Sequence, residues 1–71
     1  MIARQAGWQE IRVRLWSKKV HTFEIPFANC MYLVYPTEPI LFLILEKTST
    51  HIRIQYEERG NGVVFRIVGM I

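Results

Sequence analysis

The sequence predicts a mainly β fold, a small antiparallel sheet or barrel of five to six strands arranged as a meander of hairpins. Three observations support this fold class. Several segments alternate apolar and polar residues with a period of two, which is typical of half-buried strands. Short stretches rich in Ser, Lys, Gly, Asn or Pro separate those segments and favour turns. A chain of 71 residues has room for a single domain, residues 1–71.

The first two predicted strands are residues 11–16 and 20–25, joined by the polar turn 17–19. In the first strand the aliphatic residues take one parity and the arginines take the other. The aliphatic positions are Ile11, Val13 and Leu15. The second strand alternates as well until Pro26, which has no backbone donor, ends it. Because the intervening turn is short, we expect the two strands to pair as a hairpin.

Residues 27–35 have two open interpretations. Pro26 suits a first helical position, and Ala28 and Met31 tolerate a helix. A short helix near residues 27–35 would give an α+β fold with the helix packed across the sheet. A strand ending at Tyr35 would instead complete a set of six.

Residues 40–45 are apolar at both parities, which predicts a strand covered on both faces, so we expect this to be the central strand. Pro36, Glu38 and Pro39 separate it from the apolar residues 30–35. A membrane-spanning helix needs about 20 mostly apolar residues without such an interruption. We therefore expect no membrane span.

The last two predicted strands are residues 51–57 and 63–68, with a glycine-rich loop between them. Gly60 and Gly62 tolerate the positive φ angles that tight turns require. We expect these strands to form a second hairpin. Their core-facing positions are Ile52, Ile54, Tyr56, Val63, Phe65 and Ile67.

Charge and cysteine content bound the setting of the protein. Nine Lys and Arg against six Asp and Glu give a formal charge of +3, which favours acidic partners but is not the dense field of a dedicated nucleic-acid binder. Cys30 is the single cysteine, so no internal disulfide forms and a reducing, cytoplasmic location is expected. No basic residue flanks Cys30, and we expect a buried, inert thiol.

A chain that is 51% hydrophobic has more apolar side chains than so small an interior can hold. Large exposed apolar patches usually mark interaction sites. The leading hypothesis is therefore a small protein-binding module that acts through sheet-face or edge-strand contacts with another protein and forms a homodimer. An inhibitor or adaptor of a mobile, phage-like element fits this size. The expected interface residues are Trp8, Trp16, Val64 and Val68.

The rival hypothesis is a binder of single-stranded nucleic acid or nucleotides. Arginines bind phosphates and aromatic rings stack on bases, and several arginines share the parity opposite the aliphatic residues. The residues of this predicted site are Arg12, Arg14, Trp16, Arg53 and Arg66. Acidic and amide residues share the same parity, so a solvated lattice of opposite charges explains the arginines equally well.

The sequence predicts neither catalysis nor a cofactor. Ser17 and Ser49 lie in expected turns, and no nucleophile motif or phosphate-binding glycine loop is present. The soft metal ligands are His21, His51 and Cys30. They form no closely spaced pair of the kind that structural zinc sites use, so no metal site is expected.

Overall fold

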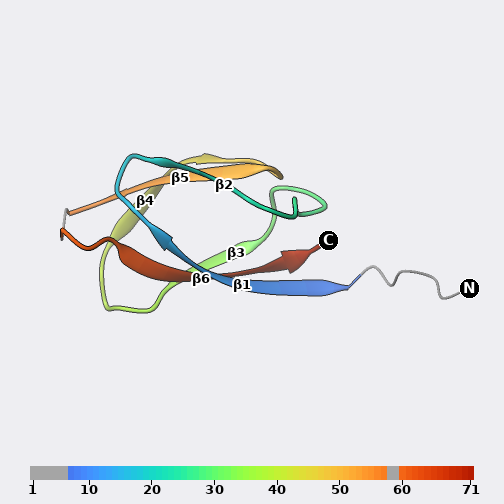
Figure 1. Cartoon of the computed structure of the whole chain (residues 1–71), viewed down its shortest axis with the longest axis horizontal. Coiled ribbons are helices and arrows are strands. Elements are labelled where there is room, and N and C mark those ends of the chain that lie inside the picture. Colours follow the sequence, from blue (N-terminus) through green and yellow to red (C-terminus); the bar gives the residue numbers. More distant parts are fainter. Residues whose placement is uncertain (1–6, 58–59) are drawn as a thin grey trace, which may run out of the picture.

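A computed structural model describes residues 7–57 and 60–71, and these residues form two three-stranded antiparallel sheets that are not closed into a barrel. Figure 1 shows the sheets stacked as two layers. The mainly β class is confirmed. The strands are β1 (Trp8–Leu15), β2 (Val20–Thr22), β3 (Leu33–Pro36), β4 (Phe42–Lys47), β5 (His51–Tyr56) and β6 (Val63–Met70).

The strands pair in a nested order. Sheet A has the order β1-β6-β3, and sheet B has the order β2-β5-β4. The longest pairing joins the two ends of the fold, from Trp8 opposite Met70 to Leu15 opposite Val63. Successive strands change sheet at every connection except the one between β4 and β5. The expected meander is therefore wrong.

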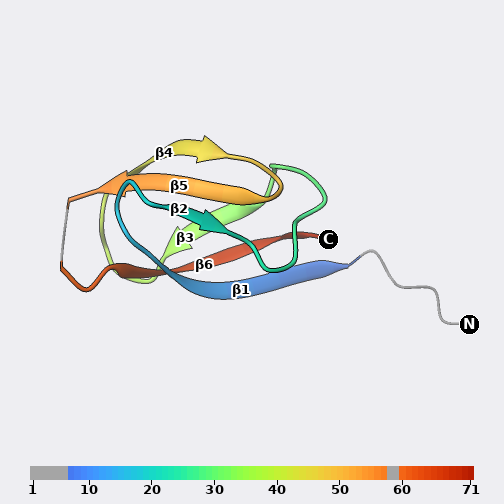
Figure 2. The same ribbon diagram turned by 45° about the horizontal axis from the view of Figure 1, so that its top comes forward.

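The predicted hairpin between residues 11–16 and 20–25 does not form, because β1 and β2 lie in different sheets (Figure 2). The turn between them carries the chain across the sandwich, with Lys18 at a φ of 67°. Ser17 fixes the crossing to sheet B. Its hydroxyl donates to the Tyr56 carbonyl at 2.9 Å and accepts from the Tyr56 amide at 2.9 Å.

The second predicted hairpin is also wrong, since β5 belongs to sheet B and β6 to sheet A. Gly60 and Gly62 do take the expected positive φ, at 82° and 72°. A tight glycine turn has the same local signature whether it returns within one sheet or passes to another. Among the described strands, β4 and β5 alone are neighbours both in sequence and within a sheet, closed where the Thr48 amide donates to the His51 carbonyl at 2.9 Å.

The segment 40–45 is not a central strand. It supplies most of β4, which lies at the edge of sheet B and pairs with β5 alone among the described strands. Leu41 is 94% exposed and Leu43 is 64% exposed. The apolar residues at both parities therefore belong to an edge strand with one exposed face. The prediction that both faces of this strand are covered is wrong.

Residues 27–35 contain no helix; they form a loop followed by β3. Phe27 and Tyr32 both enter the core, where their rings stack with centroids 4.6 Å apart. The residues between them stay outside, held by a turn in which the Met31 amide donates to Asn29 Oδ1 at 2.8 Å. Cys30 lies in this turn and is exposed, so the prediction of a buried thiol is wrong.

The core lies between the sheets and follows the predicted parities. The Tyr56 hydroxyl of β5 donates a hydrogen bond to the Leu15 carbonyl of β1 at 2.6 Å. This buried hydrogen bond joins the two sheets. Ile11 and Val13 are half-buried because β1 is an edge strand. The fully buried hydrophobic residues are Leu15, Phe23, Phe27, Tyr32, Ile52, Ile54, Tyr56, Val63, Phe65 and Ile67. Within residues 7–57 and 60–71 there is no helix long and apolar enough to cross a bilayer.

Candidate functional site

The outward surface of sheet A collects nearly all of the residues that the sequence marks as functional. The outward parity of β1, β6 and β3 places these side chains on one surface, which we call the A face, and Trp16 extends it just beyond the end of β1. The A face consists of Trp8, Glu10, Arg12, Arg14, Trp16, Leu33, Tyr35, Val64, Arg66, Val68 and Met70.

One end of the A face is apolar. Trp8 lies opposite Met70, and Val68 is paired with Leu33 of β3. Trp8 is 70% exposed and Leu33 is 52% exposed. Tryptophan and methionine, which this end exposes at Trp8 and Met70, are residue types enriched at protein interfaces.

The other end of the A face is cationic. Arg12 lies directly opposite Arg66, an arrangement of like charges that weakens the sheet. Arg66 forms an ion pair with Glu10, in which Arg66 Nε lies 3.6 Å from Glu10 Oε2. The Arg66 guanidinium also lies over the Tyr35 ring, 5.3 Å from the ring centroid. Arg12 forms no ion pair with a carboxylate of the described residues. The Arg12 side chain is also exposed at the surface.

Trp16 borders the cationic end. A Cβ atom added to Gly62 would lie 3.0 Å from Trp16 Cε2, so the indole packs on the glycine backbone. Arg14 donates from Nη1 to the Asn61 carbonyl at 2.8 Å. These contacts hold the ring and the arginine beside each other while Trp16 stays 43% exposed.

The structure unites most of the predicted site residues and separates one. Trp8, Trp16, Val64 and Val68 share the A face with Arg12, Arg14 and Arg66. Arg53 lies elsewhere, in the middle strand of sheet B, opposite Val20 and Glu46. The basic cluster therefore contains three of the four predicted arginines.

Sequence reasoning missed Leu33, Tyr35 and Met70 as members of the A face. The spacing of Leu33 and Tyr35 is that of two residues on one side of a strand, and this signal was available from residues 30–35. No local signal indicates that this strand adds to β6, which places Leu33 opposite Val68 and Tyr35 opposite Arg66.

The free edge of β4 is a second candidate surface. Along β5, hydrogen-bonded and non-hydrogen-bonded positions alternate, starting from His51, which is hydrogen-bonded to Thr48. Gln55 is therefore a hydrogen-bonded position, and its partner in β4 is Leu43, beyond the register shift between Ile44 and Glu46. The backbone groups of Phe42 and Ile44 consequently point away from β5. Exposed leucines flank them, so this edge offers both backbone hydrogen bonds and apolar contacts.

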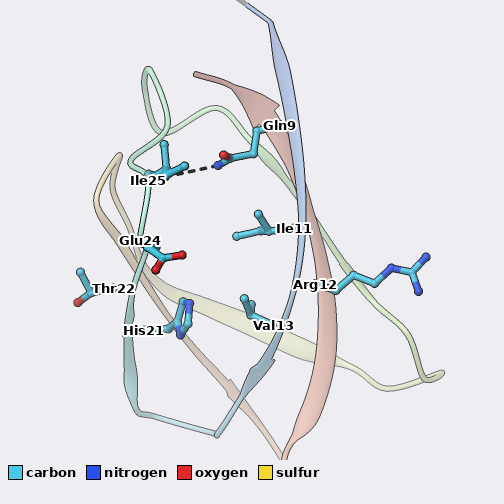
Figure 3. A pocket seen from close by; sticks show the side chains of 8 residues that line it. All are labelled: Gln9, Ile11, Arg12, Val13, His21, Thr22, Glu24 and Ile25. Atoms are coloured by element: carbon cyan, nitrogen blue, oxygen red, sulfur yellow. Dashed lines mark hydrogen bonds between the residues drawn. The ribbon is translucent and has the colours of Figure 1, made fainter.

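A third feature is a cleft of about 430 Å³ between β1 and the chain that follows β2 (Figure 3). Gln9 closes one end, where Nε2 donates to the Ile25 carbonyl at 3.4 Å. Desolvation by burial lowers the pKa of His21 from its usual value, which favours the neutral ring at physiological pH. The cleft is lined by Gln9, Ile11, Arg12, Val13, His21, Thr22, Glu24 and Ile25.

The described residues contain no cluster of three or more His, Cys, Asp or Glu side chains placed to hold a metal ion. Comparison of the chain with protein-family models, with curated proteins and with solved structures gave no match. Functional argument therefore rests on the three surfaces: the A face, the β4 edge and the cleft.

Proposed function

We propose that the protein is a small, non-enzymatic module that binds another protein through the A face and pairs with a second copy of itself through β4. The observation that carries this proposal is the exposure of large apolar side chains in two separate places, one on each sheet. A monomer rarely leaves such patches in water without a partner.

The β4 edge suits self-association because it is self-complementary. Two copies of β4 can run antiparallel about a twofold axis at Leu43, so that Phe42 of each copy faces Ile44 of the other. The outward backbone groups of both residues then hydrogen-bond, and the exposed leucines of the two copies meet across the axis. A twofold contact of this kind uses the same surface on both subunits, and it extends sheet B into a continuous six-stranded sheet.

The A face is left free by this dimer because it belongs to the other sheet. Its apolar end provides anchors, and its arginines favour a partner that is acidic at the matching position. Arginine and aromatic residues are both enriched at protein interfaces, which supports a protein as the partner.

Sedimentation velocity tests the self-association directly. The wild-type chain is expected to sediment as a dimer at micromolar concentration. Leu43→Lys places two charges beside each other on the axis and is expected to yield a monomer of unchanged β content. Leu33→Lys, the same change on the A face, is the matched control and should leave the dimer intact. A wild-type chain that sediments as a monomer throughout this range would contradict the self-association.

A second candidate function, binding of single-stranded nucleic acid or nucleotides, is favoured by the grouping of Arg12, Arg14 and Arg66 with Trp16 and Tyr35 on the A face. Phosphate contacts weaken steeply as salt rises, whereas apolar protein contacts change little. Titration of the tryptophan fluorescence with a single-stranded oligonucleotide at two salt concentrations separates the candidates. Absence of quenching at low salt would remove the nucleic-acid function.

A further inference from the structure

The outer edge of β1 carries backbone hydrogen-bonding groups that pair with no other strand of the described residues. The Ile71 amide donates to the Gly7 carbonyl at 3.0 Å, and this pair has the same register as the whole β1–β6 ladder. Antiparallel ladders alternate between hydrogen-bonded and non-hydrogen-bonded pairs. Gln9, Ile11 and Val13 are therefore bonded to β6, and the amides and carbonyls of Glu10 and Arg12 point away from it.

Those backbone groups border the cleft. In sheet A, β1 has no strand on its outer side among the described residues. Across the cleft, β2 is only three residues long and is paired with β5. The gap between β1 and β2 thus has a free strand edge along one wall, and its volume of about 430 Å³ lies in the range of ligand sites.

A strand added at this edge of β1 would meet different side chains on its two sides. On the inner side, Ile11, Val13 and Ile25 offer an apolar lining, and the Glu24 carboxylate disfavours an acidic group there (Figure 3). On the outer side, β1 presents Arg12 and Arg14. Figure 3 shows the Arg12 side chain directed away from the other labelled side chains. Opposite charges on neighbouring strands stabilise pairing.

From the free edge, the cleft, and the outward side chains of Arg12 and Arg14, we propose that β1 binds an extended peptide segment of a partner protein. In this segment, apolar residues alternate with acidic ones. The segment adds to sheet A as a fourth strand. Its apolar side chains enter the cleft, and its carboxylates lie beside Arg12 and Arg14. Strand addition of this kind draws affinity from main-chain hydrogen bonds and specificity from alternate side chains.

This inference rests on the proposed protein-binding function and specifies the partner's chemistry. It is independent of the β4 dimer, so each can fail alone. The β4 edge lacks the arginines, and β3 has Pro36 at its edge, which removes one outward donor. Of these edges, β1 alone joins free backbone groups, a cleft and two outward cations.

The test uses the full chain and a fluorescently labelled eight-residue peptide that alternates valine and glutamate. Anisotropy is expected to report binding that weakens at least tenfold when the same residues are arranged as a valine block followed by a glutamate block. Substituting lysine for the glutamates should abolish binding. Arg12→Glu combined with Arg14→Glu should reverse the preference to the lysine peptide, whereas Arg53→Glu, on sheet B, should leave it unchanged.

Amide hydrogen exchange locates the peptide. Bound peptide is expected to slow exchange at the amides of Glu10 and Arg12 at least tenfold and to leave Ile44 of β4 unchanged. Protection at Ile44 without protection at Arg12 would overturn the proposal, as would equal affinity for the block peptide. If the peptide fails and an oligonucleotide binds with loss in the Arg12→Glu, Arg14→Glu variant, the surface is a nucleic-acid site and the proposal is wrong.

Discussion

At the scale of single residues, Gly69 shows how tightly the core limits the sequence. It occupies an inward position of β6, where the Phe27 ring and the Cα and Cβ atoms of Tyr32 fill the space that a side chain would need. A Cβ atom added there would lie 2.5 Å from Tyr32 Cβ and 3.1 Å from Tyr32 Cα. Neither atom belongs to the flexible end of a side chain, so the clash cannot be relieved by a rotamer change.

Gly69→Ala is therefore expected to lower the free energy of unfolding by about 3 kcal/mol, at the upper end of typical overpacking effects. Urea denaturation followed by circular dichroism measures the change. Met70→Ala, an outward change one residue along the same strand, is the control and should stay within about 0.5 kcal/mol of wild type. Equal stability of the two variants would contradict this account of Gly69.

Tyr32 is a buried residue whose ionisation should affect stability. Its hydroxyl donates to the Thr48 carbonyl at 2.7 Å and to the His51 carbonyl at 3.2 Å, which ties the loop before β3 to the β4–β5 hairpin. Burial raises the pKa of Tyr32 to about 12, and negative charge on the Cys30 thiolate adds to this. The hydrogen bond to Thr48 acts in the opposite direction.

The raised pKa predicts a loss of stability at alkaline pH. The unfolded chain releases the Tyr32 proton near pH 10 and the folded chain only near pH 12, so rising pH favours unfolding between these values. Tyr32→Phe is expected to lose about 0.5–1.5 kcal/mol at neutral pH. The gap between the two proteins should then narrow from pH 10 to pH 12 in urea titrations, and a constant gap would refute the assignment.

At the scale of elements, strand faces could be predicted from the sequence and strand partners could not. The inward parity of Ile52, Ile54, Phe65 and Ile67 follows from a local period of two, and the structure agrees. The choice of partner depends on contacts far along the chain, such as the pairing of Trp8 with Met70. A turn of two or three polar residues has the same sequence signature whether it joins two strands of one sheet or carries the chain to the other sheet.

The same limit applies to the candidate surfaces. The parity of Arg12, Arg14 and Arg66 grouped them correctly, because all three lie in two strands that share one sheet. Arg53 had the same parity signal but belongs to the other sheet. Sheet membership is a long-range property, so the sequence predicted which side chains are outward without predicting which outer surface they share.

The edge of β3 is guarded by Pro36. Thr37 donates its amide to the Val64 carbonyl at 3.0 Å, so alternation directs the nitrogen of Pro36 away from β6, where it carries no hydrogen. Edge prolines block the addition of further strands. Pro36→Val restores an outward donor beside the exposed Leu33 and Tyr35 and is expected to cause concentration-dependent association.

Sedimentation velocity in the Leu43→Lys background isolates that effect, because the β4 contact is then absent. The doubly substituted chain should associate, and Leu43→Lys alone should remain monomeric. Retention of a monomer by the double variant up to high micromolar concentration would show that Pro36 does not protect this edge.

At the scale of the whole molecule, the nested topology determines how the chain can fold. The central strand of sheet A is β6, the last in sequence, and both β1 and β3 pair with it. Neither the β1–β6 pairing nor the β3–β6 pairing can form until β6 is available. Non-local pairing of this kind requires closure of long loops before contacts form.

Folding is accordingly expected to take milliseconds to seconds, as in other small folds dominated by non-local strand pairs. Stopped-flow dilution from urea, followed by tryptophan fluorescence, measures the rate. Refolding in microseconds would be inconsistent with a rate-limiting β1–β6 pairing.

The backbone contact between Gly7 and Ile71 also sets how the polypeptide can be rewired. Because these residues lie opposite each other just outside β1 and β6, a short flexible linker would join them without disturbing either layer. New termini could then be opened in the connection at residues 37–41, giving a circular permutant with the same neighbours in both sheets. In that permutant β6 would precede β1 along the chain, and their union would become the most local contact of the fold.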